Sequence, residues 1–297
     1  MKHARYGRWI AGFLILGPYL TPTALAQTPT EKKSDRRSPA KPQKNYKIIL
    51  PPEFDKTFRL TPVVFALHGH GGNAEWMESV WKEACADVGA ILVVGQGFTS
   101  LGDNRFAWAG AEDAGAMIEA AKKELTKKYK LHRFAPRVLT GMSQGGWATY
   151  ELAQKYPKSY RRLIPVAGML HWKTQLAAQD FTADQKNGMK RWRIYIMAGV
   201  KDANEIVADN RRVASQLKEI GAAVLAPFTD KRDPSWSLYQ DLGHAFPGQG
   251  RTQTKELTRA LRFILQPDDE DRRNWAKVDP GWERKAKWLE DKSPPSK

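Results

Sequence analysis

Cysteine is almost absent from this sequence, because Cys85 is the single one in 297 residues. One thiol excludes an intramolecular disulfide and any zinc site built from several cysteines, so packing must stabilise the fold. Acidic residues are also scarce, since 32 Asp and Glu stand against 48 Lys and Arg. The resulting formal net charge of +16 favours acidic surfaces or polymers as neighbours through long-range attraction. Charge of this kind does not by itself indicate a nucleic-acid-binding protein.

Internal repeats are missing as well. We find none at solenoid or propeller spacing, which excludes those architectures, and the 23 Gly and 18 Pro show no collagen period. A composition with 41% hydrophobic and 27% charged residues is ordinary for a globular protein and excludes wholesale disorder. At about 150 residues per domain, the length permits one large domain or two small ones.

Residues 1–26 have the three parts of a secretory signal peptide. They open with a positive region formed by Lys2, Arg5 and Arg8. The apolar stretch at residues 9–20 is too short for a comfortable membrane span, and Ala24 and Ala26 are the small residues that a signal peptidase reads. We expect cleavage after Ala26 and a secreted or periplasmic protein, with an uncleaved N-terminal anchor as the alternative. No transmembrane span is expected after cleavage.

Two further segments flank the main part of the chain. Residues 27–44 are rich in Pro, Ser, Thr and Lys, which is typical of a flexible basic linker. This linker is either a tether to an anionic cell-envelope surface or simply a solvated leader. Residues 267–297 form a C-terminal tail that contains three tryptophans, namely Trp275, Trp282 and Trp288. A solvated tail rarely carries three tryptophans, so we expect a docked irregular or helical segment.

Between these segments, residues 45–266 alternate between short apolar runs and amphipathic stretches. The runs lie at 46–50, 63–67, 90–94, 137–140, 163–166, 193–197 and 223–227. Stretches with helical spacing lie at 111–128, 147–155, 206–220 and 252–265. Such alternation predicts an α/β domain with one mostly parallel central sheet. Because the runs are almost wholly apolar, we expect helices on both faces of that sheet.

The strongest local motif is Gly141-Met142-Ser143-Gln144-Gly145, which fits G-x-S-x-G. A predicted strand enters it and a predicted helix leaves it, which is the context that a nucleophile elbow requires. A side chain at Gly141 or Gly145 would collide with neighbouring backbone in so tight a turn. The motif therefore predicts Ser143 as a nucleophile above the carboxyl edge of the sheet. The alternative is a Gly/Ser turn without a catalytic role.

A serine hydroxyl needs a base to take its proton, and the expected order along the chain is Ser, then Asp, then His. Among the six histidines, His244 alone lies late enough, on a loop before the last predicted helix; the alternative is a surface histidine. Asp202 follows the next-to-last predicted strand and is the expected partner of His244, with a helix N-cap as its alternative role. Competing acids lie further from the end of that strand, at Glu205, Asp209, Asp230 and Asp241.

An oxyanion hole needs two backbone N–H groups. One is expected from Gln144, directly after the nucleophile. The second is expected from the glycine-rich loop at residues 68–72, where His70 is the preferred donor and Gly69 the alternative. A metal site at His68 and His70 is disfavoured because no third ligand stands nearby. Neither glycine cluster fits a phosphate-binding loop, and nothing indicates a nicotinamide, flavin or metal cofactor.

Several tryptophans fall on or near loops that face the predicted site: Trp76, Trp108, Trp147, Trp172 and Trp236. Their rings are able to stack on a sugar or a hydroxycinnamoyl group, although packing explains most of them. Trp172, which follows the sixth predicted strand, is the best candidate for a pocket wall. Trp108 and Trp147 are further candidates for substrate binding.

Taken together, these residues resemble the α/β-hydrolase superfamily over about residues 46–266. Within it they resemble secreted esterases described as polyhydroxybutyrate-depolymerase-like, feruloyl-esterase-like or prolyl-oligopeptidase-like. The matching motifs are residues 67–72 for the oxyanion loop, 137–146 for the elbow, 199–202 for the acid loop and 243–246 for the base loop. Three short segments after the elbow match as well, at residues 151–153, 156–157 and 165–168. Residues 227–236 are longer and more polar than this resemblance implies, and the C-terminal tail has no counterpart in it.

The resemblance implies a serine hydrolase that cleaves a small-molecule or oligomeric carboxylic ester through an acyl-enzyme. A serine peptidase is an alternative, although the sequence gives no sign of a gating domain. A non-catalytic binding protein for an anionic polymer is another alternative, and the presence of all of Ser143, Asp202 and His244 argues against it. Nucleic-acid binding is less favoured still, because no aromatic and basic recognition motif is present.

Overall fold

The computed structural model describes residues 44–170 and 182–289. The fold described below belongs to the unit that begins at Lys44. The predicted signal peptide, the predicted linker apart from Lys44, and Trp172 lie outside the described residues. No helix within the described ranges is both long enough and apolar enough to cross a membrane.

A seven-stranded sheet forms the centre of the domain, in the order β1-β3-β2-β6-β7-β8-β9. Its strands are β1 (Tyr46–Ile49), β2 (Val63–Leu67), β3 (Ile91–Gly95), β6 (Arg137–Met142), β7 (Arg162–Val166), β8 (Arg193–Tyr195) and β9 (Ala223–Leu225). β1 runs antiparallel to β3, and the other neighbouring pairs are parallel. Each of the seven predicted runs thus forms one strand of a mostly parallel sheet, as the sequence predicts.

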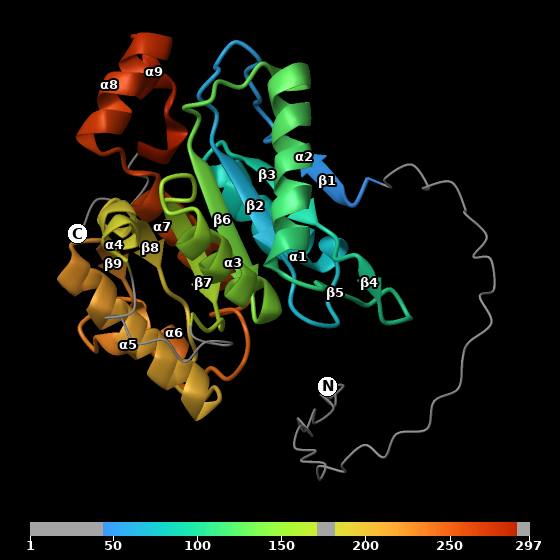
Figure 1. Cartoon of the computed structure of the whole chain (residues 1–297), viewed down its shortest axis with the longest axis vertical. Helices are drawn as coiled ribbons and strands as arrows, with labels where there is room; N and C mark the ends of the chain where they lie inside the picture. Colours follow the sequence, from blue (N-terminus) through green and yellow to red (C-terminus); the bar gives the residue numbers. More distant parts are fainter. Residues whose placement is uncertain (1–43, 171–181, 290–297) are drawn as a thin grey trace, which may run out of the picture. The chain divides into compact units, whose positions relative to one another are not determined.

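The four predicted helices are present, and further elements appear that the sequence analysis did not predict. The predicted ones are α2 (Ala111–Tyr129), α3 (Gln144–Lys155), α5 (Asn204–Ile220) and α7 (Gly250–Leu265). The additional ones are α1 (Ala74–Asp87), α4 (Ala183–Met189), α6 (Trp236–Gln240), the 3₁₀ turn η2 (Pro227–Thr229) and a hairpin of β4 (Thr99–Ser100) and β5 (Phe106–Ala107). The helices α2 and α3 pack together on one face of the sheet, and α1 and α7 pack together on the other (Figure 1).

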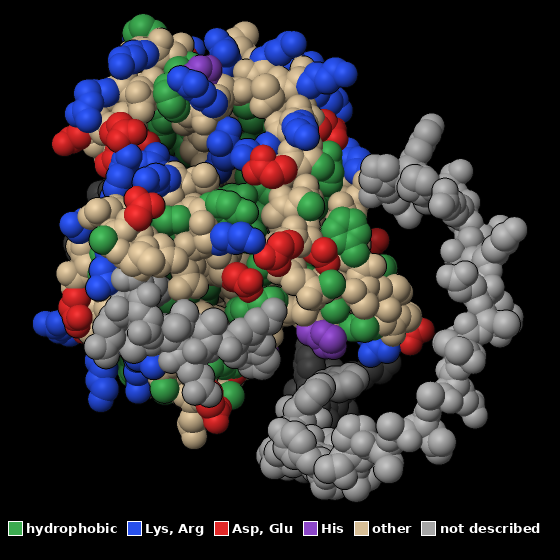
Figure 2. All heavy atoms as spheres, in the orientation of Figure 1, with side chains coloured by type: hydrophobic (Ala, Val, Ile, Leu, Met, Phe, Trp, Pro, Cys, Tyr) green, Lys and Arg blue, Asp and Glu red, His purple; other side chains and the backbone are tan. Residues whose placement is uncertain are grey.

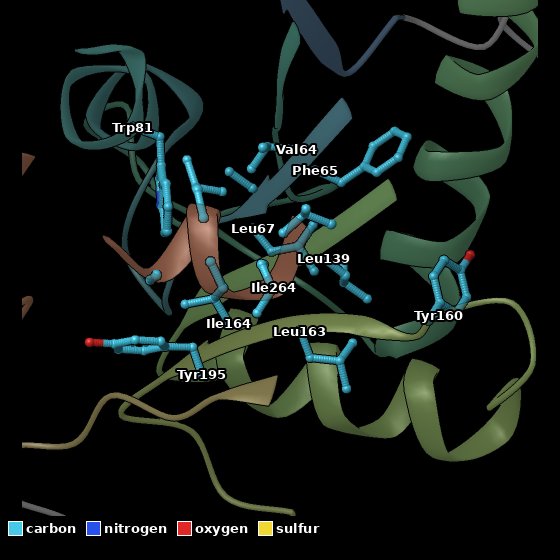
Figure 3. Packing of buried hydrophobic residues seen from close by; sticks show 14 of the residues in the cluster. Val64, Phe65, Leu67, Trp81, Leu139, Tyr160, Leu163, Ile164, Tyr195 and Ile264 are labelled. Atoms are coloured by element: carbon cyan, nitrogen blue, oxygen red, sulfur yellow. The ribbon is translucent and has the colours of Figure 1, made fainter. Parts of the chain in front are cut away.

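The hydrophobic core lies on both faces of the sheet. Neighbouring residues of a strand point to opposite faces, and Figure 3 shows Leu163 directed toward α3 while Ile164 points toward Ile264 of α7. All three of these side chains are fully buried. A strand covered on both faces needs apolar side chains at every position, which explains the continuous apolar runs of the sequence.

The C-terminal segment packs against the domain through its tryptophans. It forms α8 (Asp269–Val278), α9 (Trp282–Lys285) and η3 (Lys287–Leu289). Trp275 donates its indole N–H to the Phe134 carbonyl at 2.8 Å, and the ring of Trp288 stacks on Phe58 at 6.1 Å. Trp275, Trp282 and Trp288 are each exposed by 3% or less. Three rings removed from water hold this segment in place.

Candidate active site

Ser143 occupies a strained turn between β6 and α3. Its backbone angles are φ 53° and ψ −114°, a combination that costs a non-glycine residue about 1–3 kcal/mol and tends to occur at functional sites. Hydrogen bonds on both sides hold the turn: the Ser143 N–H donates to the Val166 carbonyl at 2.8 Å, and the Trp147 N–H donates to the Ser143 carbonyl at 2.8 Å. The surrounding structure therefore fixes Ser143 at the carboxyl end of the central strand.

Glycines make this turn sterically feasible. A Cβ atom on Gly141 would collide with the backbone of Gly145, and one on Gly145 would collide with the carbonyl oxygens of Leu67 and His68. The sequence predicts both collisions. Because neither residue carries a side chain, the start of α3 lies directly against the end of β2.

The loop after β2 lies directly beside Ser143. A Cβ atom on Gly69 would come within 3.3 Å of the Ser143 Cβ, and His70 follows in an exposed position. Among the described residues, no group accepts a hydrogen bond from the backbone N–H of either His70 or Gln144. Both N–H groups are therefore uncommitted within the described residues, and their role in an oxyanion hole stays a prediction.

His68 is a buried support of this loop. The Gly97 N–H donates to His68 Nε2 at 2.9 Å, so Nδ1 carries the proton and donates to the Gly69 carbonyl at 2.7 Å. Burial lowers the pKa of His68, which keeps this neutral tautomer in place. Both ring nitrogens are thus committed, and no cluster of metal-ligating side chains occurs within residues 44–170 and 182–289.

Trp108 supports the same loop, and its predicted role in substrate binding stays a prediction. The side chain is 2% exposed, and its indole N–H donates to the His68 carbonyl at 2.9 Å. The amide of Gln144 clamps the Trp108 backbone: Nε2 donates to the Trp108 carbonyl at 2.8 Å, and Oε1 accepts the Trp108 N–H at 3.1 Å. A ring enclosed in this way supports the loop.

Asp202 and His244 form a hydrogen-bonded pair. His244 Nδ1 lies 3.1 Å from Oδ1 and 3.0 Å from Oδ2 of Asp202. The Asp202 side chain is 3% exposed, whereas that of His244 is 41% exposed. The buried carboxylate orients the ring so that Nδ1 carries the proton and Nε2 is left as the base. The N-cap of α5 is Ala203, so Asp202 is not that cap, although it accepts the Ala203 N–H at 2.7 Å.

The acid loop and the base loop are joined through their backbones. The Val200 N–H donates to the Tyr239 carbonyl at 2.8 Å, and the Lys201 N–H donates to the Leu242 carbonyl at 3.0 Å. A Cβ atom on Gly199 would collide with the carbonyl oxygens of Leu242 and Gly243. Gly199 therefore permits the close approach that brings Asp202 to His244, a role that the sequence analysis did not assign.

Replacing Gly199 with Ala is expected to separate these loops and to lower both stability and activity. Relieving the collision must move backbone, and overpacking of this kind typically costs about 1–3 kcal/mol. Gly243→Ala is the matched control, since a Cβ there has only the Lys201 carbonyl within 4 Å, at 3.9 Å. Thermal unfolding of both variants measures the difference. Equal losses of stability would contradict the assigned role of Gly199.

The unpredicted helix α1 fixes the base loop. Phe246 is 5% exposed and its ring makes edge contacts with Trp76 at 5.7 Å and with Trp81 at 6.2 Å. Met77, Val80, Trp81 and Ala84 are buried along α1, and Asn73 caps the helix by accepting the Trp76 N–H at 2.8 Å. The sequence analysis missed α1, although this apolar spacing behind an N-cap is the kind of signal that predicts a helix.

The structure brings Asp202 and His244 into contact, but it shows no hydrogen bond from Ser143 to His244 within the described residues. Ser143, Asp202 and His244 follow β6, β8 and β9 in the expected order, so all three lie toward the carboxyl ends of the parallel strands. The described residues contain no hydrogen bond between Ser143 Oγ and His244 Nε2. Such contacts are often long in unliganded enzymes and shorten when substrate binds. Trp147 is 8% exposed, and its substrate role stays a prediction.

A separate groove of about 410 Å³ lies between α2 and α3. Glu112, Glu119, Glu151, Lys155 and Tyr156 are among its lining residues. Ser143, Asp202 and His244 do not line it, so it is distinct from the candidate active site.

Comparisons with protein-family models and with curated proteins gave no match. Solved structures do match. Esterase PE8 is 17% identical, with 74% of this chain and 99% of that chain covered and a TM-score of 0.51. A carboxylesterase from Mesorhizobium loti is 18% identical, with 73% and 93% covered and a TM-score of 0.50. A ferulic acid esterase is 15% identical, with 74% and 91% covered and a TM-score of 0.52. At these identities the likeness establishes the fold alone, and the chain has the fold of the α/β-hydrolase superfamily.

Proposed function

We propose that this protein is a serine hydrolase that cleaves carboxylic esters. The observation that carries the proposal is the strained backbone of Ser143 at the end of β6, because such strain persists only where the surrounding structure imposes it. The hydrogen-bonded pair of Asp202 and His244 supplies the base that the serine needs. Three solved structures of similar fold are named an esterase, a carboxylesterase and a ferulic acid esterase, which supports the reaction class by analogy.

In the proposed reaction, Ser143 Oγ attacks the ester carbonyl carbon while His244 Nε2 takes the hydroxyl proton. The carbonyl oxygen becomes an oxyanion, which accepts hydrogen bonds from the N–H groups of His70 and Gln144. As the C–O bond to the alcohol breaks, His244 returns the proton to the leaving oxygen. Water then attacks the acyl-enzyme with the same proton transfers, releasing the acid and restoring Ser143. Asp202 stays ionised and stabilises the imidazolium.

The test combines turnover with covalent labelling. Residues 27–297 are assayed with p-nitrophenyl esters from acetyl to octanoyl and are treated in parallel with a fluorophosphonate probe. We expect turnover, and we expect mass spectrometry to locate the label on Ser143. The chain-length profile then measures the size of the acyl pocket. A folded protein that neither turns over these esters nor labels at Ser143 would refute the proposal and favour a binding protein for an anionic polymer.

We also propose that residues 1–26 direct export, as their charge and hydropathy pattern predicts. Expression of the full chain in a bacterial host is expected to give a secreted or periplasmic protein that begins at Gln27. Intact-mass measurement and N-terminal sequencing of the purified protein check the cleavage site. A product that retains Met1 and fractionates with membranes would identify an uncleaved anchor instead.

A further inference from the structure

A buried carboxylate lies behind the candidate active site. Glu256 on α7 is 3% exposed and accepts hydrogen bonds from three hydroxyls. Tyr195 and Tyr239 donate to Oε1 at 2.6 and 2.7 Å, and Ser235 donates to Oε2 at 2.5 Å. An ionised carboxylate offers acceptor sites only, so three converging donors match it. Burying such a group costs solvation free energy, and an apolar residue would often be at least as stable in its place.

The three hydroxyls come from the two chain segments that lead to the acid and the base. Tyr195 ends β8, the strand that precedes the loop of Asp202, and Figure 3 shows its hydroxyl directed away from the hydrophobic cluster. Ser235 and Tyr239 belong to the start and the body of α6, directly ahead of the loop of His244. Glu256 therefore connects both segments to one point on α7.

Charge compensation completes this network. Arg259, one turn further along α7, makes a bidentate pair with Asp233 at 2.7 and 2.8 Å and donates to Ser235 Oγ at 2.7 Å. Its guanidinium lies 3.8 Å from Glu256 Oε2. Burial, together with the nearby Glu256 carboxylate, raises the pKa of Tyr195, which keeps that phenol protonated as a donor. The polar character of residues 227–236 thus has a structural use, because this segment supplies Asp233 and Ser235.

We propose that Glu256 is a positioning residue for the acid–base pair, an inference that rests on the proposed function. One backbone hydrogen bond connects α6 to the loop of Asp202, and α6 leads directly into the loop of His244. The carbonyl of Tyr239 accepts the N–H of Val200, two residues before Asp202. A shift of α6 therefore moves the acid loop and the base loop against each other, and displacing a catalytic group by about 1 Å can lower a rate about 10²-fold.

The test is Glu256→Gln, which keeps the size of the side chain but replaces one acceptor oxygen with an NH₂ donor. At least one hydroxyl then meets a donor instead of an acceptor. We expect kcat to fall by about 10- to 100-fold, with KM changed by less than about twofold, because the substrate-contacting surface is intact. The rate of fluorophosphonate labelling at Ser143 is expected to fall by a similar factor. All assays are run at a temperature where circular dichroism shows each variant folded.

Asp271→Asn separates positioning from stability. Asp271 is also a buried carboxylate, 5% exposed, and it binds Arg162 at 2.5 Å at the opposite, amino end of the sheet. We expect this variant to lose thermal stability while kcat stays within about twofold of the wild type. A merely structural role of Glu256 predicts the same result for both variants, namely lower stability with normal kcat in the folded protein.

Tyr239→Phe keeps the proposal testable should Glu256→Gln fail to fold, since it retains the ring and removes one hydroxyl. It is expected to lower kcat in the same way, and its effect combined with Glu256→Gln is expected to be smaller than the sum of the two in free energy, as for residues of one network. Normal kcat in folded Glu256→Gln or Tyr239→Phe overturns this inference alone. A wild-type protein that is inactive and unlabelled overturns the proposed function itself.

Discussion

Replacing Ser143 with Ala is expected to lower kcat for a p-nitrophenyl ester by about 10⁶-fold, as for other hydrolases that lose their nucleophile. Ser143 lies at the turn that Gly69, Gly141 and Gly145 enclose, so the substitution removes the proposed nucleophile from that turn. The residual rate should come from the oxyanion donors and substrate binding alone. Initial rates on a preparation free of host esterases measure this loss.

The Ser143→Ala variant is expected to fold normally. Alanine keeps the Cβ atom, so the strained backbone at φ 53° costs the same in both proteins, and thermal unfolding should be nearly unchanged. The variant should also resist the fluorophosphonate probe. Activity within tenfold of the wild type would show that another residue is the nucleophile and would refute the proposed reaction.

Replacing Asp202 with Asn is expected to lower kcat by about 10⁴-fold. The Asp202 carboxylate accepts the Nδ1–H of His244 at 3.0 Å, and this bond leaves Nε2 unprotonated. An amide that presents its NH₂ to the ring favours the other tautomer, in which Nε2 carries the proton and cannot act as a base. Steady-state rates of the two proteins, compared at one pH, measure the effect.

Asp241→Asn is the matched control for this variant. Asp241 is a competing acid in the sequence and lies on the same pair of loops, but its side chain is 86% exposed and pairs with Lys201 at the surface. Exposed ion pairs contribute little, so kcat is expected to stay within about twofold of the wild type. A larger loss in Asp241→Asn than in Asp202→Asn would reverse the assignment of the acid.

Local sequence patterns predict most of the fold. The seven apolar runs become the seven strands of the sheet, because strands buried on both faces carry apolar residues without interruption. Apart from α1, most of the elements that were missed are short. α6 spans Trp236–Gln240 only, and β4 and β5 have two residues each. Segments of two to five residues are too short to show a hydrophobic period.

The tryptophans show the same limit within the candidate site. Loop position suggested that Trp108 faces the substrate, yet its indole is buried and bonded to the His68 carbonyl. The sequence places an aromatic residue near a site, but the direction of its ring depends on the partners that the fold provides. Gln144 provides one of them, through the two hydrogen bonds from its side chain to the Trp108 backbone.

By itself, the sequence determined the elbow around Ser143, since the glycine spacing and the flanking strand and helix are local properties. It also indicated the order of Ser143, Asp202 and His244 along the chain. Only the tertiary structure decided how Asp202 reaches His244. That contact depends on Gly199, which has no side chain to separate the two loops, and on the hydroxyls of β8 and α6 that donate hydrogen bonds to Glu256. These groups are far apart in sequence, and burial brings them together because each must find a hydrogen-bond partner away from water.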